Sequence, residues 1–110
     1  MKEISQNSYN VTVYVAGDIQ TARDSLRRQC FENGLCVTVT PTTFVYTAGA
    51  EEGVAVGLVN YPRFPKSPDE IRERAKVVAV RLMTDLHQWS ALVVGPDETL
   101  WLTRRPDDSK

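Results

Sequence analysis

Hydrophobic and polar residues alternate strictly in one stretch near the start of the chain. Val11, Val13 and Val15 fall on one side of it, and Thr12 and Tyr14 fall on the other. An alternation with a period of two is typical of a strand with one buried face. Residues 9–17 are therefore predicted to form a strand that Gly17 ends.

The next segment, residues 19–33, has the periodicity of a helix. Its apolar side chains recur at intervals of three and four, which places them on one inner face: Ile19, Ala22, Leu26 and Cys30. Asp18 can cap the start of this helix, and Gly34 can adopt the positive φ that often follows a helix end. We interpret Cys30 as a small core residue.

A β-hairpin is predicted from about residue 35 to residue 61. Residues 35–47 are rich in β-branched side chains, residues 48–53 ("AGAEEG") are predicted to turn, and residues 54–61 form the partner strand. Pro41 cannot donate a hydrogen bond to a neighbouring strand, so it should mark a bulge or an edge strand.

The start of a second helix has the clearest local signal in the chain. Ser67 and Glu70 form the sequence pattern of a capping box, with Pro68 at the first helical position. The helix is predicted to continue through Trp89, with one apolar stripe: Ile71, Ala75, Val78, Leu82, Leu86 and Trp89. Further apolar residues, Val77, Val80 and Met83, lie outside that stripe. They predict a neighbouring helix or a second chain against this surface.

Two short strands, residues 90–95 and 99–105, complete the chain. The order β-α-β-β-α-β with an added strand predicts an α+β, ferredoxin-like two-layer sandwich, in which both helices cover one face of an antiparallel sheet. Residues 1–110 make one domain, with frayed ends at 1–8 and 105–110. The uncovered face is predicted to be polar and aromatic, with these candidates: Thr12, Tyr14, Thr38, Thr40, Tyr61 and Trp101.

Composition narrows the classes of function. The chain carries 13 basic and 14 acidic residues, so it lacks the basic excess that favours binding of nucleic acid. Two cysteines, Cys30 and Cys36, are too few for a disulfide framework and predict free thiols in a reducing compartment. The polar first residues and the absence of an apolar run near 20 residues predict no signal peptide and no membrane span. The expected location is the cytoplasm.

Signals of an enzyme are few. His87 is the single histidine and has no nucleophile spaced with it, and the common catalytic, phosphate-binding and metal-binding motifs are missing. We therefore predict no catalytic residue, no metal and no cofactor. Residues 13–19 ("VYVAGDI") resemble the first strand of the RNA recognition motif, in which Tyr14 would stack on a base. The matching third-strand aromatics are missing, and Glu51 and Glu52 replace its basic start.

A proline-rich loop spans residues 58–70. Prolines at every third position stiffen it, which suits a connector between a strand and a helix. Stiffness alone does not require Tyr61, Arg63 and Phe64, residue types that are enriched at binding hot spots. Two alternatives follow: an exposed Phe64 in a contact surface, or a Phe64 buried beneath the loop as an anchor.

Two stretches, "GLCVTVTPTTFVYT" and "VGLVNYPRFP", resemble small uncharacterised proteins encoded by tailed phages and prophages. The resemblance covers about residues 34–65. It implies a bacterial cytoplasm and an accessory or host-directed role, and it carries no activity.

These observations together predict a small non-enzymatic binding protein whose partner is another protein or a second copy of itself, as in a homodimer. The predicted binding residues are Tyr14, Tyr61, Arg63, Phe64 and Trp101. The alternative is a single-stranded RNA-binding domain that uses the open sheet face. An enzyme of unknown reaction is the third hypothesis.

Overall fold

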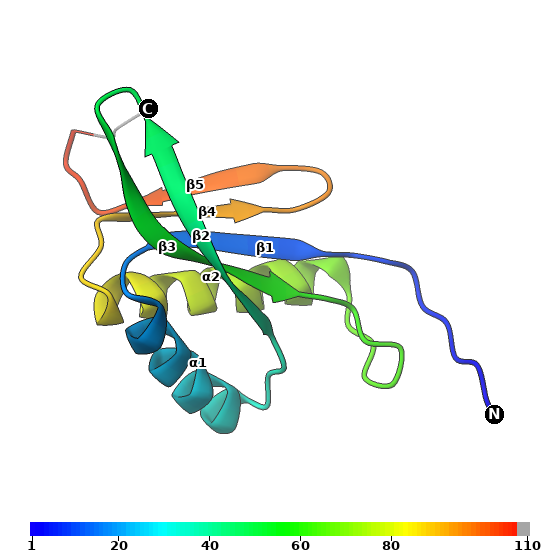
Figure 1. Cartoon of the computed structure of the whole chain (residues 1–110). Helices are drawn as coiled ribbons and strands as arrows, with labels where there is room; N and C mark the ends of the chain where they lie inside the picture. The colour runs from blue at the N-terminus through cyan, green and yellow to red at the C-terminus, as the bar shows by residue number, and fades with distance from the viewer. Residues whose placement is uncertain (108–110) are drawn as a thin grey trace.

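The computed structural model describes residues 1–107 and contains one five-stranded sheet and two helices. The elements in chain order are β1 (Val11–Ala16), α1 (Ile19–Asn33), β2 (Thr38–Tyr46), β3 (Gly49–Leu58), α2 (Pro68–Asp85), β4 (Ser90–Val94) and β5 (Thr99–Thr103). The strand order is β2-β3-β1-β4-β5, and every neighbouring pair is antiparallel. Both helices lie against the same face of the sheet (Figure 1). The predicted ferredoxin-like sandwich with an added strand is confirmed.

The core lies between the sheet and the helices and is almost entirely aliphatic. The predicted alternation in β1 holds, since Val11, Val13 and Val15 are all buried. Of the two Trp, four Tyr and three Phe in the chain, only Tyr9 is buried among the described residues. Its hydroxyl donates to Asp97 and accepts from Arg72. The other aromatic side chains are partly or largely exposed.

Helix α2 is shorter than predicted. It ends at Asp85, where the Leu86 backbone N–H donates to the Leu82 carbonyl and the His87 backbone N–H donates to the Thr84 carbonyl. His87 then takes a φ of 57°, a left-handed conformation that stops the helix. Trp89, which was predicted on the inner stripe, lies beyond this break and is 56% exposed.

The surplus apolar residues of α2 divide into two groups. Met83 is buried and α1 packs beside α2, which agrees with the first of the two predicted alternatives, a neighbouring helix. Val77 and Val80 remain exposed. Self-association through this surface stays a prediction.

The turn of the hairpin is tighter than predicted. Tyr46 pairs with Gly49, so the turn consists of Thr47 and Ala48, and the expected turn residues 49–53 belong to β3. Their backbone groups pair with β2, but the side chains of residues 49–52 are all exposed. This part of the strand therefore shows no alternation of hydrophobic and polar residues that would predict it. Pro41 lies in β2, an edge strand, as predicted.

The inner face of α1 buries two polar residues and leaves Cys30, which was predicted there, only partly buried. Ser25 and Gln29 are fully buried, whereas Cys30 is only partly buried. Ser25 donates to Asp85 of α2 at 2.5 Å, and Gln29 donates to Ser25 at 3.0 Å. Arg28 also pairs with Asp85, at 3.3 Å. A polar contact between the helices thus takes the place expected for an apolar one.

The frayed ends of the chain stay a prediction. Residues 1–8 are exposed and outside the helices and strands, and the N-terminus extends away from the domain (Figure 1). The predicted frayed end at 105–110 falls partly on residues 108–110, which lie outside the described residues. No helix in the described part of the chain is long and apolar enough to span a bilayer.

The capping box of α2 is formed as predicted. The Ser67 hydroxyl accepts from the Glu70 backbone N–H at 3.2 Å, and the Glu70 carboxylate accepts from the Ser67 backbone N–H at 3.1 Å. Replacing Ser67 with alanine should lower the free energy of unfolding by about 1 kcal/mol, because a helix donor loses its partner. Urea unfolding measures this. The control Ser67→Asp retains a cap and should stay near the wild-type value; equal losses in both variants would contradict the assignment.

Candidate functional site: an aromatic pocket on the open face of the sheet

A pocket of about 300 Å³ lies on the sheet face that the helices leave uncovered. We call it the aromatic pocket. Four aromatic rings line it, together with one acid and one base: Tyr14, Phe44, Tyr46, Trp101, Glu51 and Arg105. Ala16, Gln88, Ser90, Ala91 and Leu92 complete the lining. Almost half of the aromatic residues of the chain thus gather around one concave surface.

Strand pairing places the first two rings. Tyr14 of β1 is paired with Leu92 of β4, and Leu92 is paired with Trp101 of β5. Directly paired residues of neighbouring strands project to the same face of a sheet. Tyr14, Leu92 and Trp101 therefore form a row across three strands, with Tyr14 half-buried and Trp101 54% exposed.

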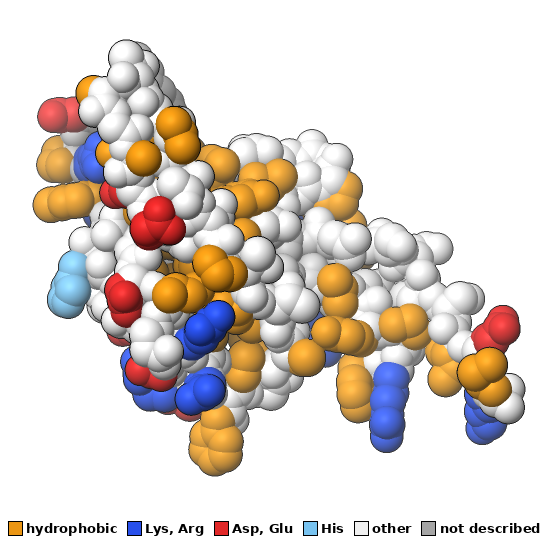
Figure 2. Space-filling view, in the orientation of Figure 1, with side chains coloured by type: hydrophobic (Ala, Val, Ile, Leu, Met, Phe, Trp, Pro, Cys, Tyr) orange, Lys and Arg blue, Asp and Glu red, His pale blue; other side chains and the backbone are white. Residues whose placement is uncertain are grey.

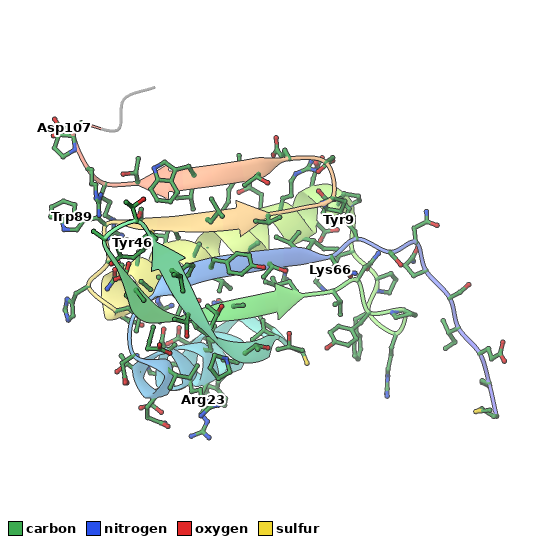
Figure 3. The ribbon with its side chains drawn as sticks, turned by 45° about the horizontal axis from the view of Figure 1, so that its top comes forward. Tyr9, Arg23, Tyr46, Lys66, Trp89 and Asp107 are labelled. Carbon is green, nitrogen blue, oxygen red and sulfur yellow. The ribbon has the colours of Figure 1, made fainter. Side chains whose placement is uncertain are left out.

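The β2–β3 hairpin brings the other two rings. It twists away from the plane of the sheet, and its end carries Tyr46 towards the end of β4 where Trp89 lies (Figures 1 and 3). Phe44 sits against Gly53 of β3. A Cβ atom on Gly53 would lie 2.4 Å from the Phe44 ring and 2.6 Å from the Val15 carbonyl oxygen. The missing side chain at Gly53 is therefore what lets the Phe44 ring lie over the strand.

Opposite charges flank the rings. Glu51 is contributed by β3 and Arg105 by the segment after β5, and both side chains are exposed. Neither forms an ion pair with a described residue. The aromatic pocket thus offers ring faces, a carboxylate and a guanidinium to one ligand.

A second pocket, of about 260 Å³, lies beneath the proline-rich loop on the helix side of the sheet. We call it the basic pocket. Its lining combines apolar and aromatic side chains with two cations: Leu35, Cys36, Leu58, Val59, Tyr61, Phe64, Ile71, Lys66 and Arg74, next to Gly34. Figure 2 shows hydrophobic side chains gathered around this loop at the surface.

A hydrogen bond holds Tyr61 at the wall of the basic pocket. Its hydroxyl lies 3.4 Å from the Cys36 thiol. This bond, with a smaller contribution from the charge of Cys36 and from burial, raises the pKa of Tyr61. Arg63 stacks on Phe64, with its guanidinium carbon 5.4 Å from the ring centroid.

The structure separates the five predicted binding residues. Tyr14 and Trp101 share the aromatic pocket, whereas Tyr61 and Phe64 line the basic pocket and Arg63 lines neither. The placement of Tyr61 on the open sheet face was wrong, because the chain leaves the sheet at Leu58. Phe64 is 64% exposed, so it is not the buried anchor of the second alternative. A role of these residues in binding stays a prediction.

Sequence reasoning missed two of the four rings of the aromatic pocket and both of its charged residues. Phe44 and Tyr46 follow Thr38 and Thr40 at even positions of β2, so the same alternation carries them to the open face. Glu51 was assigned to a turn, and Arg105 to a frayed end. No group of three or more His, Cys, Asp or Glu residues that could hold a metal ion is present within residues 1–107.

No protein-family model and no curated protein sequence matches the chain. Among solved structures, a phage SAM lyase in the apo state matches with a TM-score of 0.75 and 13% sequence identity, over 94% of this chain and 94% of that one. The phage SAM lyase in complex with S-methyl-5'-thioadenosine matches with a TM-score of 0.74 and 14% identity, over 94% and 95% of the two chains. At this identity the likeness shows a shared fold.

This likeness contradicts the prediction of a non-enzymatic binding protein. The solved structures that share nearly the whole fold are of an enzyme, and the third hypothesis, an enzyme, fits them better than binding of a protein or of RNA. The prediction failed because it relied on the absence of short catalytic motifs. The neighbours are phage proteins, in agreement with the resemblance to phage-encoded proteins. The chain therefore has the fold of a phage SAM lyase.

Proposed function

We propose that this protein binds S-adenosylmethionine (SAM) in the aromatic pocket and cleaves it to S-methyl-5'-thioadenosine. The observation that carries the proposal is the convergence of four aromatic rings with one acid and one base on a single pocket. The likeness in fold to a phage SAM lyase, including a complex with S-methyl-5'-thioadenosine, supports this choice of ligand.

The chemistry of SAM matches this lining. Its sulfonium is a cation, and aromatic ring faces attract cations by about 0.5–2 kcal/mol. Its adenine ring can stack on Trp101 or a tyrosine, an interaction worth roughly 1–3 kcal/mol per base. Arg105 is suited to the carboxylate of the amino-acid end, and Glu51 to one of the positive groups.

The basic pocket fits this substrate less well. Lys66 and Arg74 line it, and its lining contains no acidic residue. Their positive charge opposes a sulfonium in a partly desolvated site. The difference in charge between the two pockets is why we assign SAM to the aromatic pocket.

The product defines which bond breaks. S-methyl-5'-thioadenosine keeps the methyl and adenosyl groups, so the bond from sulfur to the γ-carbon of the amino-acid fragment is cleaved, and its electron pair stays on sulfur. The carboxylate oxygen of the same fragment can form the new bond to the γ-carbon, which requires neither water nor a base. Both charges are lost in this step. Side chains that displace water from the bound substrate would therefore lower the barrier, because the transition state carries less charge than the substrate.

Incubation of the purified protein with SAM, followed by chromatography of the products, tests the proposal. We expect S-methyl-5'-thioadenosine to form in proportion to the protein concentration. SAM also decomposes without a catalyst, so a protein-free sample gives the background rate. A rate equal to that background would overturn the proposal.

The role of Arg105 gives a more specific prediction. The Arg105→Gln change should raise KM by about threefold to tenfold, the expected cost of losing a partly exposed charged contact. It should not lower kcat, because the carboxylate loses its charge in the transition state and the lost contact stabilises mainly the bound substrate. Initial rates over a range of SAM concentrations measure both constants. Arg23→Gln, on the surface of α1, is the control; a fall in kcat for Arg105→Gln alone would contradict the assignment.

A further inference from the structure

We infer that the basic pocket is a second ligand site, which takes a small organic anion with a carboxylate or phosphate group on an apolar body. It lies apart from the aromatic pocket. Leu58, in the basic pocket, pairs with Val11 at the start of β1, whereas Ala16, in the aromatic pocket, ends that strand. The two pockets also open on opposite faces of the sheet, so neither forms part of the other.

The lysine of this pocket has no counterion within the described part of the chain. Lys66 is half-buried and forms no ion pair with any residue from 1 to 107. Partly buried charges are costly unless they are paired. Arg74, also half-buried, donates to the Asn33 carbonyl at 3.3 Å and makes no ion pair in the same part of the chain. An anion placed between Lys66 and Arg74 would supply the missing negative charge.

Two acidic residues of α2, Glu70 and Glu73, form no ion pair with these cations. The carboxylate of Glu70 accepts from the Ser67 backbone N–H, which lowers its pKa most, and Lys66 and Arg74 lower it further from a distance. Glu73 pairs with Lys76 on the outer side of α2, at 3.3 Å. Glu70 therefore feels the positive field of the pocket without forming an ion pair with it.

The remaining walls indicate the body of the ligand. Leu58 and Ile71 are buried and form an apolar floor, and the rings of Tyr61 and Phe64 stand at the sides. A volume of about 260 Å³ is just below the usual range for ligand pockets, roughly 300–1,000 Å³, which favours a small molecule.

The loop is fixed before any ligand binds. The Phe64 backbone N–H donates to the Tyr61 carbonyl at 3.0 Å, and the Lys66 backbone N–H donates to the Asn60 side chain at 2.9 Å. Asn60 in turn donates to the Asn7 carbonyl at 3.0 Å. With its three prolines, the loop loses little freedom on binding, which lowers the entropic cost of a small ligand.

Matched probes test this inference by amide NMR. Phenylacetate and phenyl phosphate carry the expected anion on an aromatic ring, and 2-phenylethylamine carries a cation on a similar body. We expect either anion to shift the amide signals of residues 34–36 and 58–61 and of Phe64 and Lys66, and the amine to shift none of them. Binding of one anion alone identifies the preferred group and still supports the site.

Substitutions separate a specific site from general attraction. Lys66→Gln should raise the Kd for the anion by about tenfold, the value expected for a lost hydrogen bond to a charged group. Lys76→Gln removes the same charge outside the pocket and should leave the affinity unchanged. Equal binding of the amine, equal effects of the two substitutions, or no shifts at all would overturn the inference. Formation of S-methyl-5'-thioadenosine should be unchanged in Lys66→Gln, so the outcome is independent of the proposed function.

Discussion

Replacing Tyr14 and Trp101 together with leucine should lower kcat/KM for S-methyl-5'-thioadenosine formation by roughly 100-fold. Each ring is expected to contribute on the order of tenfold by stacking on SAM, a contact that persists in the transition state. Leucine keeps an apolar wall but offers no ring face. Because Trp101 is 54% exposed and Tyr14 is half-buried, the folded state should change little, and thermal melting checks this.

The control for this experiment is Trp89→Leu. Trp89 is as exposed as Trp101, at 56%, but it does not line the aromatic pocket. It should retain full activity. Full activity in the double variant, or an equal loss in Trp89→Leu, would show that the four rings do not form the SAM site. The single variants then show whether the two effects are additive, since substitutions at neighbouring residues often have non-additive effects.

The Gly53→Ala change is expected to have the second large effect. A new Cβ would collide with the Phe44 ring and also with the Val15 carbonyl oxygen, and backbone in the middle of a sheet cannot move aside easily. Overpacking of this kind costs about 1–3 kcal/mol of unfolding free energy. The ring of Phe44 must also leave its place at the aromatic pocket, so activity should fall together with stability.

Gly49→Ala is the matched control on the same strand. The contacts of a Cβ at Gly49 begin at 3.7 Å, an ordinary van der Waals distance to the Tyr46 ring. The free energies of unfolding of the two variants, measured in urea, should therefore differ by at least about 1 kcal/mol. Equal stability in the two variants would mean that the hairpin does not pack as described, and the position of Phe44 in the aromatic pocket would be wrong.

The absence of short catalytic motifs is weak evidence against an enzyme, for a physical reason. Catalytic motifs are short sequence patterns that mark a nucleophile, a base or a metal ligand, and the common ones are missing from this chain. A reaction in which the substrate supplies its own nucleophile requires none of these groups. What the protein must then provide is a shaped, charge-matched and partly dry pocket, and such a pocket is assembled from residues that are distant in sequence.

Local patterns determined the elements and their order. The alternation in β1, the helical spacing in α1 and the capping box of α2 each depend on residues within a few positions of one another. From that order, the right-handed crossover rule placed both helices on one face of the sheet. Tyr14 and Trp101 could be assigned to the open face because side-chain direction in a strand follows from alternation alone.

Only the tertiary structure decided which of these side chains meet. Tyr14 and Trp101 come together because β1 and β5 both pair with β4. Phe44 and Tyr46 reach them through the twist of the β2–β3 hairpin, whose turn was predicted at the wrong residues. Glu51 and Arg105, like Lys66 and Arg74, owe their positions to strand register and loop packing. Register and twist are set by contacts between distant segments, which a local pattern does not contain. The sequence by itself therefore determined the fold, and tertiary packing determined the two pockets.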